Sequence, residues 1–541
     1  MSRAITLRPW QAAAFERFRA STEPDFLAVA TPGAGKTTFA LTCARWVMTQ
    51  TTCRLIVVAP TAHLKVQWAA AAERFGIQLD TEWSSSQDRL ASDMHGIVTT
   101  YQQVATSAGS LRGFAHDAFV VFDEIHHAGD DRAWGTSVLT AFAGAKRRLS
   151  ISGTPFRSDT AAIPFVRYNL DEAESDYDYG YAQALGDGGV VRPVYFPRID
   201  GHMEWTSPAG DVYSADFQDE LARDRGAERL RTALSLEGEW LPTVLREANN
   251  RLERIRVSHP TAAGLVIATD QDHARGIAGI LANRLGVAAE VVTSDDPTSS
   301  MRIERFASNT TPWLVAVRMV SEGVDIPRLR VGVYATTTST ELFFRQAVGR
   351  FVRWTSGLRS QKAYVFIPDD PRLRTHAFQI ADQRRHSLRK RDDDGVEFLR
   401  DESAFDTGDV GDAEQLSLFT ALSSIATEVT MHSVGYDDEP DPPEPDEWLG
   451  AMVIDLEPLP LPGGARLADI GLNRREQRER LRESNAELAR TLVDRTGMTH
   501  AKVNSELNRL AGVTKVSEAT LDQLERRVRY GESWLRRTRR P

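Results

Sequence analysis

One short segment carries residue types that could bind phosphate. Residues 30–37 read Ala-Thr-Pro-Gly-Ala-Gly-Lys-Thr. Gly33 and Gly35 allow a tight turn and a close backbone approach, while Lys36 and Thr37 supply a positive charge and a hydroxyl. A loop of this composition predicts a site for nucleotide phosphates and Mg²⁺. The residues expected around them are Gly33, Ala34, Gly35, Lys36, Thr37 and Thr38.

A second segment ends in two adjacent carboxylates. Residues 119–122 form the apolar run Phe-Val-Val-Phe, and Asp123 and Glu124 follow directly. Open α/β sheets bind ligands at the carboxyl ends of their strands, where this pair would stand. We expect Thr37 to hold the metal ion, Asp123 to hold it directly or through a metal-bound water, and Glu124 to orient an attacking water. A strand that ends in a solvated acidic turn is the alternative, and the phosphate loop upstream disfavours it.

The elements around the loop must position it. Residues 26–30 predict a buried parallel strand and residues 38–47 predict a helix. Such a strand, turn and helix aim backbone N–H groups at phosphate. The stricter loop pattern begins with glycine, whereas this chain has Ala30. An ordinary glycine turn is the alternative, but Gly-Lys-Thr directly after the strand argues against it.

Further motifs follow along the chain. Residues 123–126, Asp-Glu-Ile-His, form a DExH box, and over roughly residues 5–370 the chain resembles superfamily 2 helicases. The motif Gln-Ala-Val-Gly-Arg-Phe-Val-Arg is the most specific part of this resemblance. The segments that carry it are residues 7–11, 30–38, 57–61 with Leu64, Gln67 and Trp68, 96–101, 123–126, 152–157, 264–268, 321–327 and 346–353.

The resemblance implies roles in the first half of the chain. Gln11 would read adenine, and His126 would report the nucleotide state. Residues 57–68 and 96–101 would contact the backbone of one nucleic-acid strand. Residues 152–157 would couple ATP hydrolysis to strand movement.

The resemblance also implies that a second domain completes the nucleotide site, with Gly323 and Asp325 contributing to it. Arg350 and Arg353 are one helical turn apart, so we expect them on one helix face, reaching across a cleft as arginine fingers. Gln346 would share that face and contact phosphate or water. A surface helix with ion pairs is the alternative.

Two positions depart from the family pattern. Val317 stands where threonine is common, so a contact to a nucleic-acid phosphate is missing or comes from Arg318 or Ser321. Ser152 replaces a frequent threonine but keeps the hydroxyl.

Composition fits a large enzyme of the cytoplasm. A length of 541 residues suggests about three or four domains. Cys43 and Cys53 are too few for a disulfide framework, and we see no signal peptide and no apolar run of membrane-spanning length. We therefore expect a reducing, cytoplasmic location without membrane association.

The net charge of −10 is unevenly distributed. Residues 437–447 hold seven acidic residues and four prolines, which predicts an unstructured linker. Beyond Pro462 there are 18 basic against 11 acidic residues, and apolar residues recur at helical spacing. This tail is similar to the tails of helicases from actinobacteria and their phages. It could be a helix-turn-helix DNA reader with the helix from Thr499 in the major groove, a site for a protein partner, or a purely structural bundle.

We expect an α/β fold with two tandem RecA-like parallel-sheet domains and a small all-helical C-terminal module. The expected divisions are an ATP-binding RecA-like domain at 1–183, a second RecA-like domain at 184–370 with a helical insertion near 216–256, a helical extension at 371–436, an acidic Pro-rich linker at 437–464 and a basic helical module at 465–541.

The resemblance implies an ATP-dependent DNA helicase or translocase, an ATPase stimulated by nucleic acid. DNA is favoured because residues 152–155 and 346–350 look like the restriction and repair branch and unlike the RNA-directed DEAD-box branch. One rival is a motor subunit of a restriction or phage-defence complex. The other is a nucleic-acid clamp in which ATP sets affinity without unwinding.

Overall fold

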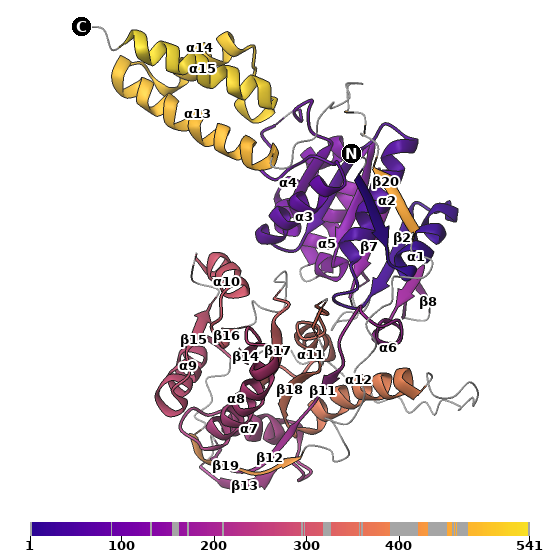
Figure 1. The fold of residues 1–541 in the computed structure, drawn as a ribbon, viewed down its shortest axis with the longest axis vertical. Coiled ribbons are helices and arrows are strands. Elements are labelled where there is room, and N and C mark those ends of the chain that lie inside the picture. The colour runs from indigo at the N-terminus through magenta and orange to yellow at the C-terminus, as the bar shows by residue number, and fades with distance from the viewer. Residues whose placement is uncertain are drawn as a thin grey trace.

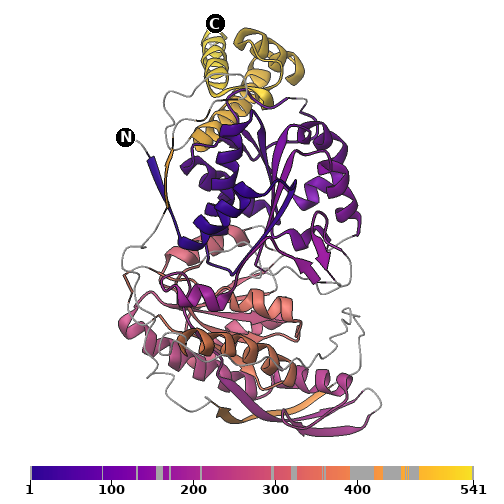
Figure 2. The ribbon, with the colours of Figure 1, turned by 90° about the vertical axis from the view of Figure 1, so that its right-hand side faces the viewer.

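The computed structural model describes residues 3–87, 89–129, 132–153, 162–169, 172–207, 210–293, 296, 298–317, 326–355, 357–358, 361–389, 420–430, 452–456, 459, 461 and 474–538. Two α/β units lie one beyond the other along the long axis, and a helical module sits at one end (Figures 1 and 2). The expected fold of two RecA-like parallel-sheet domains with a helical C-terminal region is confirmed. None of the helices in these ranges combines the length and the apolarity that crossing a bilayer requires.

Domain 1 is built on a parallel sheet that has seven strands in the described residues. Its strands are short apolar runs such as Arg54–Ala59, with buried side chains, as expected for a sheet covered on both faces. In spatial order they are β10 (Tyr177–Tyr179), β2 (Asp25–Ala30), β7 (Arg147–Ser152), β6 (Ala118–Asp123), β3 (Arg54–Ala59), β5 (Gly96–Thr100) and β4 (Leu79–Asp80). The helices that accompany it are α1 (Pro9–Ala20), α2 (Lys36–Gln50), α3 (Ala62–Arg74), α4 (Tyr101–Ala115) and α5 (Arg132–Phe142), with η1 (Ile125–Gly129) and the hairpin of β8 (Arg167–Asn169) and β9 (Glu172–Glu174).

The order of this sheet explains where a site can form. β2, β7 and β6 are adjacent and parallel, so their carboxyl ends lie side by side. The phosphate loop follows β2, Asp123 ends β6, and Ser152 ends β7. Segments more than a hundred residues apart in sequence therefore meet at one edge.

Domain 2 is a mixed sheet with nine strands among the described residues. Its path is β13 (Val212–Asp216), β12 (Arg198–Thr206), β18 (Ala363–Pro368), β17 (Leu329–Ala335), β14 (Ala263–Ala268), β16 (Trp313–Val317) and β15 (Ala289–Val292), with β11 (Val194–Tyr195) beside β18 and β19 (Thr420–Thr430) beside β12. Its helices are α7 (Arg223–Ala233), α8 (Trp240–Ser258), α9 (Gln271–Leu285), α10 (Ser299–Ser308), α11 (Glu341–Val348) and α12 (Pro371–Arg389). A short helix, α6 (Tyr181–Gly186), lies in the segment that leads from domain 1 to domain 2.

Three expected divisions differ from the structure. The helical stretch near 216–256 is not an insertion, because α8 buries Leu241, Val244 and Leu245 against the sheet of domain 2. The extension at 371–436 is not helical throughout, since its residues 420–430 form β19, which pairs antiparallel with β12. Helix α12 begins this extension as expected.

The expected linker at 437–464 also contains a strand. β20 (Met452–Leu456) pairs antiparallel with β1 (Arg3–Leu7) along the edge of domain 1 (Figure 1). Met452, Ile454 and Leu456 alternate along β20 and pack on the core of domain 1, which explains why this segment is a strand. The acidic run at 437–447 lies outside the described residues.

The C-terminal module consists of α13 (Arg474–Thr496), α14 (His500–Ala511) and α15 (Leu521–Arg537), with η3 (Val516–Glu518) before the last helix. Thr499 and Thr520 cap α14 and α15 by accepting backbone N–H bonds, as expected at helix starts. Leu492, Val503 and Leu507 belong to a buried core between the helices.

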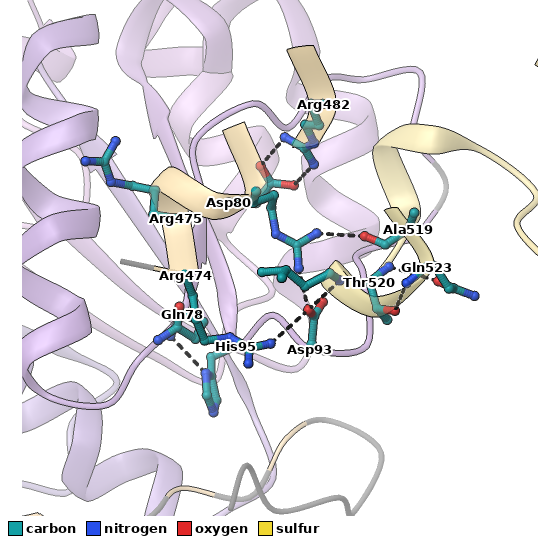
Figure 3. A network of polar contacts seen from close by, with 12 residues as sticks. Gln78, Asp80, Asp93, His95, Arg474, Arg475, Arg482, Ala519, Thr520 and Gln523 are labelled. Carbon is teal, nitrogen blue, oxygen red and sulfur yellow. Dashed lines mark hydrogen bonds and ion pairs between the residues drawn. The ribbon is translucent and has the colours of Figure 1, made fainter. Parts of the chain in front are cut away.

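The module is docked on domain 1 through buried charges (Figure 3). Asp93 accepts from the guanidinium groups of Arg474 and Arg478. Asp80 binds Arg482 with both carboxylate oxygens, at 3.3 and 3.1 Å. The three arginines are four residues apart and share one face of α13. Three of the tail's basic residues therefore lie against carboxylates of domain 1.

Candidate active site between the two domains

The phosphate loop is a turn that requires glycine. Gly33 has φ 82° and Gly35 has φ 94°, both in the left-handed region. A Cβ at position 35 would lie 2.7 Å from Nε2 of Gln11, so this glycine is required for space as well as for conformation. Lys36 begins α2 directly after the loop, with its side chain at the edge where the strands end.

Side chains of the segment before α1 hold the back of this loop. Arg8 Nη1 donates to the carbonyls of Gly33 at 3.1 Å and Ala34 at 2.8 Å, and Trp10 Nε1 donates to Ala34 O at 3.0 Å. Gln11 Nε2 donates to Gly35 O at 2.9 Å. These donors engage the loop carbonyls, so that the carbonyl oxygens are not left facing a phosphate.

The position of Gln11 therefore differs from the one expected for a residue that reads adenine from the cavity wall. It is 2% exposed, and its Oε1 accepts the backbone N–H of Arg8 at 2.8 Å. Both ends of its amide thus bind backbone, and it is not among the residues that line the cavity described below. As placed, Gln11 supports the loop.

Ala34 and Thr38 are likewise part of the loop's frame. The N–H of Ala34 donates to Thr31 O at 3.1 Å, and that of Thr38 donates to Gly35 O at 3.1 Å. Thr37, in contrast, lines the cavity together with Lys36 and Asp123.

Glu124 sits at the centre of the charged contacts. Its Oε1 lies 2.8 Å from Lys36 Nζ. Its Oε2 accepts from Gly153 N at 2.9 Å and from Ser152 Oγ at 3.1 Å. Glu124 has φ 48°, a conformation that is strained for a residue with a side chain and that these contacts hold in place.

The two carboxyl groups titrate in opposite directions. Burial acts to raise the pKa of Glu124, but Lys36, His126 and the Gly153 amide outweigh it and hold that pKa below its ordinary value. Burial raises the pKa of Asp123, and the adjacent Glu124 charge raises it further. Neighbouring carboxyl groups whose pKa values are shifted in opposite directions are typical of functional sites.

Asp123 is fixed by two aromatic residues. Trp68 Nε1 donates to Asp123 Oδ2 at 2.7 Å, and the Tyr101 hydroxyl donates to Asp123 O at 2.9 Å. Sequence reasoning placed both aromatics in strand-contact segments and missed this role, because no local pattern reveals a contact across the sheet.

His126 joins the two domains. Its Nε2 lies 3.2 Å from Gln346 Nε2, and its Nδ1 lies 3.1 Å from Ser152 Oγ. An amide nitrogen donates, so His126 Nε2 accepts and its Nδ1–H donates to Ser152, whose hydroxyl donates to Glu124. A directed chain of hydrogen bonds thus runs from domain 2 to Glu124. Gln346, expected near phosphate or water, contacts His126 in this arrangement.

Arg350 and Arg353 do not share a helix face. Helix α11 ends at Val348, and Arg353 forms an isolated antiparallel bridge with Val191, which lies in the segment that leads from domain 1 to domain 2. A Cβ on Gly33 would lie 3.4 Å from Cδ of Arg353, which places this arginine against the phosphate loop. Both arginines nevertheless line the same cavity as Lys36.

This cavity, of about 750 Å³, receives residues from both domains. Positive side chains exceed acidic ones among its lining residues, which suits a triphosphate with a cation. The ionisable residues that line it are Arg8, Lys36, Asp123, Glu124, Asp178, Tyr179, Tyr181, Arg345, Arg350 and Arg353.

Several lining residues were missed. Tyr179 ends β10, Tyr181 begins α6, and Ile380 and Gln383 lie on α12, where the sequence has no motif for such a role. The expected residues Gly323 and Asp325 lie outside the described residues, as do residues 154–157 of the coupling motif.

The chain is similar to several known proteins. Residues 4–157 match the family described as type III restriction enzyme, res subunit. The chain is 38% identical over 563 residues to an uncharacterized protein of Mycobacterium leprae, covering 96% of this chain and 93% of the relative. It is 41% identical over 564 residues to one of Mycobacterium tuberculosis, covering 96% and 92%. A solved fragment described as an HsdR subunit of a type I restriction enzyme from Vibrio vulnificus is 17% identical, with a TM-score of 0.48 over 68% of this chain and 65% of that one.

Proposed function

The chain belongs to the superfamily 2 helicases, and from this premise we propose that it is an ATP-dependent DNA helicase or translocase whose ATPase is stimulated by nucleic acid. The observation that carries the proposal is a single cavity lined by Lys36, Asp123 and Glu124 from domain 1 and by Arg350 and Arg353 from domain 2. Because both domains contribute residues to the site, ATP hydrolysis depends on how the two domains are placed relative to each other.

The residues divide the work of phosphoryl transfer. Lys36 and the loop N–H groups hold the phosphates, and a phosphate competes with Glu124 for the Lys36 charge. Freed from Lys36, Glu124 is the base that orients water. Thr37 and Asp123 would hold Mg²⁺, which when bound supplies positive charge to the phosphate oxygens. Arg350 and Arg353 stabilise charge that develops on the transferred group.

Movement follows from the contacts between the domains. The chain Gln346, His126, Ser152 and Glu124 spans the cavity only while the domains lie close. The domains close on ATP and open after hydrolysis. This cycle moves the enzyme along a nucleic-acid strand, whose backbone residues 57–68 and 96–101 contact. The preference for DNA rests on the resemblance of residues 152–155 and 346–350 to the restriction and repair branch.

A second candidate is a translocating motor subunit of a restriction or phage-defence complex. The match of residues 4–157 to the res-subunit family favours it. In that case the exposed surface of the C-terminal module is where a protein partner would bind. A clamp without turnover is disfavoured, because Lys36, Glu124 and the two arginines are all in place.

Phosphate release with and without single-stranded DNA tests the proposal. We expect stimulation by DNA, and we expect Lys36→Ala to abolish turnover because the main phosphate charge is lost. DNA binding without ATP hydrolysis would instead support the clamp. Strand displacement on tailed duplexes then separates an unwinding enzyme from a motor that translocates without unwinding.

A further inference from the structure

Two helices of domain 1 begin at segments that the proposed function assigns to strand contact. Thr61 caps α3, where its side chain accepts the Leu64 N–H at 3.4 Å. Thr100 caps α4, where its side chain accepts the Gln103 N–H at 3.1 Å. Helix α4 packs against β6, the strand that ends in Asp123, and α3 packs against β3, the neighbour of β6 in the same sheet.

Each helix sends one aromatic side chain with a polar tip to the same acidic residue. Trp68 on α3 is 2% exposed, and its indole N–H donates to the Asp123 carboxylate at 2.7 Å. Tyr101, at the start of α4, is fully buried, and its hydroxyl donates to the Asp123 carbonyl at 2.9 Å. One contact orients the side chain of Asp123, and the other holds the backbone just before the strained Glu124.

We propose that Trp68 and Tyr101 are positioning residues that link nucleic-acid contact at the starts of α3 and α4 to the aim of the Asp123 carboxylate. This inference rests on the proposed function. Trp68 donates to Oδ2, so Oδ1 is the oxygen that would hold a cation. A shift of α3 relative to the sheet moves the Trp68 indole and, with it, the Asp123 carboxylate. A shift of α4 moves the backbone that carries Glu124.

A comparison of two buried tryptophans favours a positioning role for the Trp68–Asp123 hydrogen bond over a purely structural one. Trp83 shows that an indole N–H of this domain can be buried without a hydrogen-bond partner among the described residues, since this residue is 2% exposed and its Nε1 has none there. Trp68 is therefore matched by a second buried tryptophan of the same domain that lacks the contact to Asp123. Partners that orient metal-binding carboxylates commonly matter about tenfold or more for metal affinity or activity.

The test compares Trp68→Phe with Trp83→Phe in the full-length chain. Both changes keep an aromatic ring and remove an N–H. Binding of a fluorescent ATP analogue is measured over a range of Mg²⁺ concentrations and in EDTA, and phosphate release is measured over a range of single-stranded DNA concentrations. We expect Trp68→Phe to raise the Mg²⁺ needed for half-maximal binding by about tenfold, with binding in EDTA unchanged. Trp83→Phe should match the wild type.

Tyr101→Phe removes a single oxygen and serves as the second variant. It should lower the maximal stimulation by DNA several-fold while leaving the Mg²⁺ requirement near that of the wild type. Wild-type Mg²⁺ dependence in Trp68→Phe, or equal shifts in Trp83→Phe, would overturn the inference, as would unchanged DNA stimulation in Tyr101→Phe. If the wild type itself lacks DNA stimulation, the proposed function fails, while the Mg²⁺ titration still decides the role of Trp68.

Discussion

Domain 1 makes two very different interfaces. Toward domain 2 the polar contacts include the hydrogen bond between His126 and Gln346 and a 3.7 Å pair of His63 with Glu304, whose side chain is 65% exposed. Toward the C-terminal module the carboxylates are buried, with the Asp80 side chain 1% exposed in its pair with Arg482. The first interface encloses a cavity, and the second encloses ion pairs.

The difference indicates which interface can open. A single neutral hydrogen bond or a partly exposed histidine–glutamate pair costs little to break, because water replaces the lost partner. Separating a buried ion pair exposes or strands two charges, which is far more costly. We therefore infer that the module moves with domain 1, while domain 2 moves against both. Burial lowers the pKa of Arg478 even beside Asp93, which indicates that this pair is strongly desolvated.

The largest expected effect is at the interface that opens. Arg353→Ala should lower turnover by about a thousandfold, as loss of an arginine finger does, with ATP affinity largely kept. Arg345→Ala is the matched control, because Arg345 lines the same cavity but is paired with Glu341 at 2.7 Å. Equal losses in the two variants, measured by phosphate release and nucleotide binding, would remove the special role of Arg353.

The next effect is at the interface that stays closed. Asp93→Ala leaves Arg478 buried without its carboxylate, so the docked state should lose about 3–5 kcal/mol. Hydrogen exchange of α13 and limited proteolysis of the module would measure this loss. Glu525→Ala breaks an exposed pair with Arg529 on α15 and should cost less than about 1 kcal/mol. Wild-type protection of α13 in Asp93→Ala would contradict the docking account.

A smaller effect concerns pH at the same interface. Burial lowers the pKa of His95 from 6.5 to about 4, with Arg45 and Arg474 adding to the shift and Asp93 opposing it. The folded state then binds fewer protons than the unfolded chain between these values, so stability is present above pH 6.5 and falls toward pH 4. The loss amounts to about 3 kcal/mol.

The variant His95→Asn isolates this contribution. Its amide oxygen can accept the Gln78 N–H that His95 Nδ1 now accepts at 2.9 Å. Denaturant unfolding at several pH values should show a shallower loss of stability in the variant between pH 6.5 and 4. Identical slopes in the two proteins would exclude His95 as the cause.

The sequence predicted the parts of the site that depend on local geometry. The phosphate loop and the Asp123–Glu124 pair could be recognised because a strand, a turn and a helix follow one another without interruption. The arrangement of Arg350 and Arg353 was predicted wrongly as one helix face, since α11 ends at Val348 before either residue.

The remaining features depend on distant partners. β19 pairs with β12, and β20 pairs with β1, across more than two hundred residues of chain, so neither pairing has a local signal. The same holds for the bond between Trp68 and Asp123, because the sheet order places β3, on which α3 packs, beside β6. The basic tail suggested nucleic acid, but charge counts do not reveal that three of its arginines face carboxylates of domain 1.

The most direct measurement is a pair of distances within one molecule. Fluorescent labels at Glu16→Cys, Asp272→Cys and Arg529→Cys would mark domain 1, domain 2 and the module at exposed positions, and the native Cys43 and Cys53 are buried. We predict that the distance between positions 16 and 272 is shorter with a non-hydrolysable ATP analogue and Mg²⁺ than with ADP, while that between 16 and 529 stays constant. An unchanged distance between 16 and 272 would contradict the account of a nucleotide closing two domains.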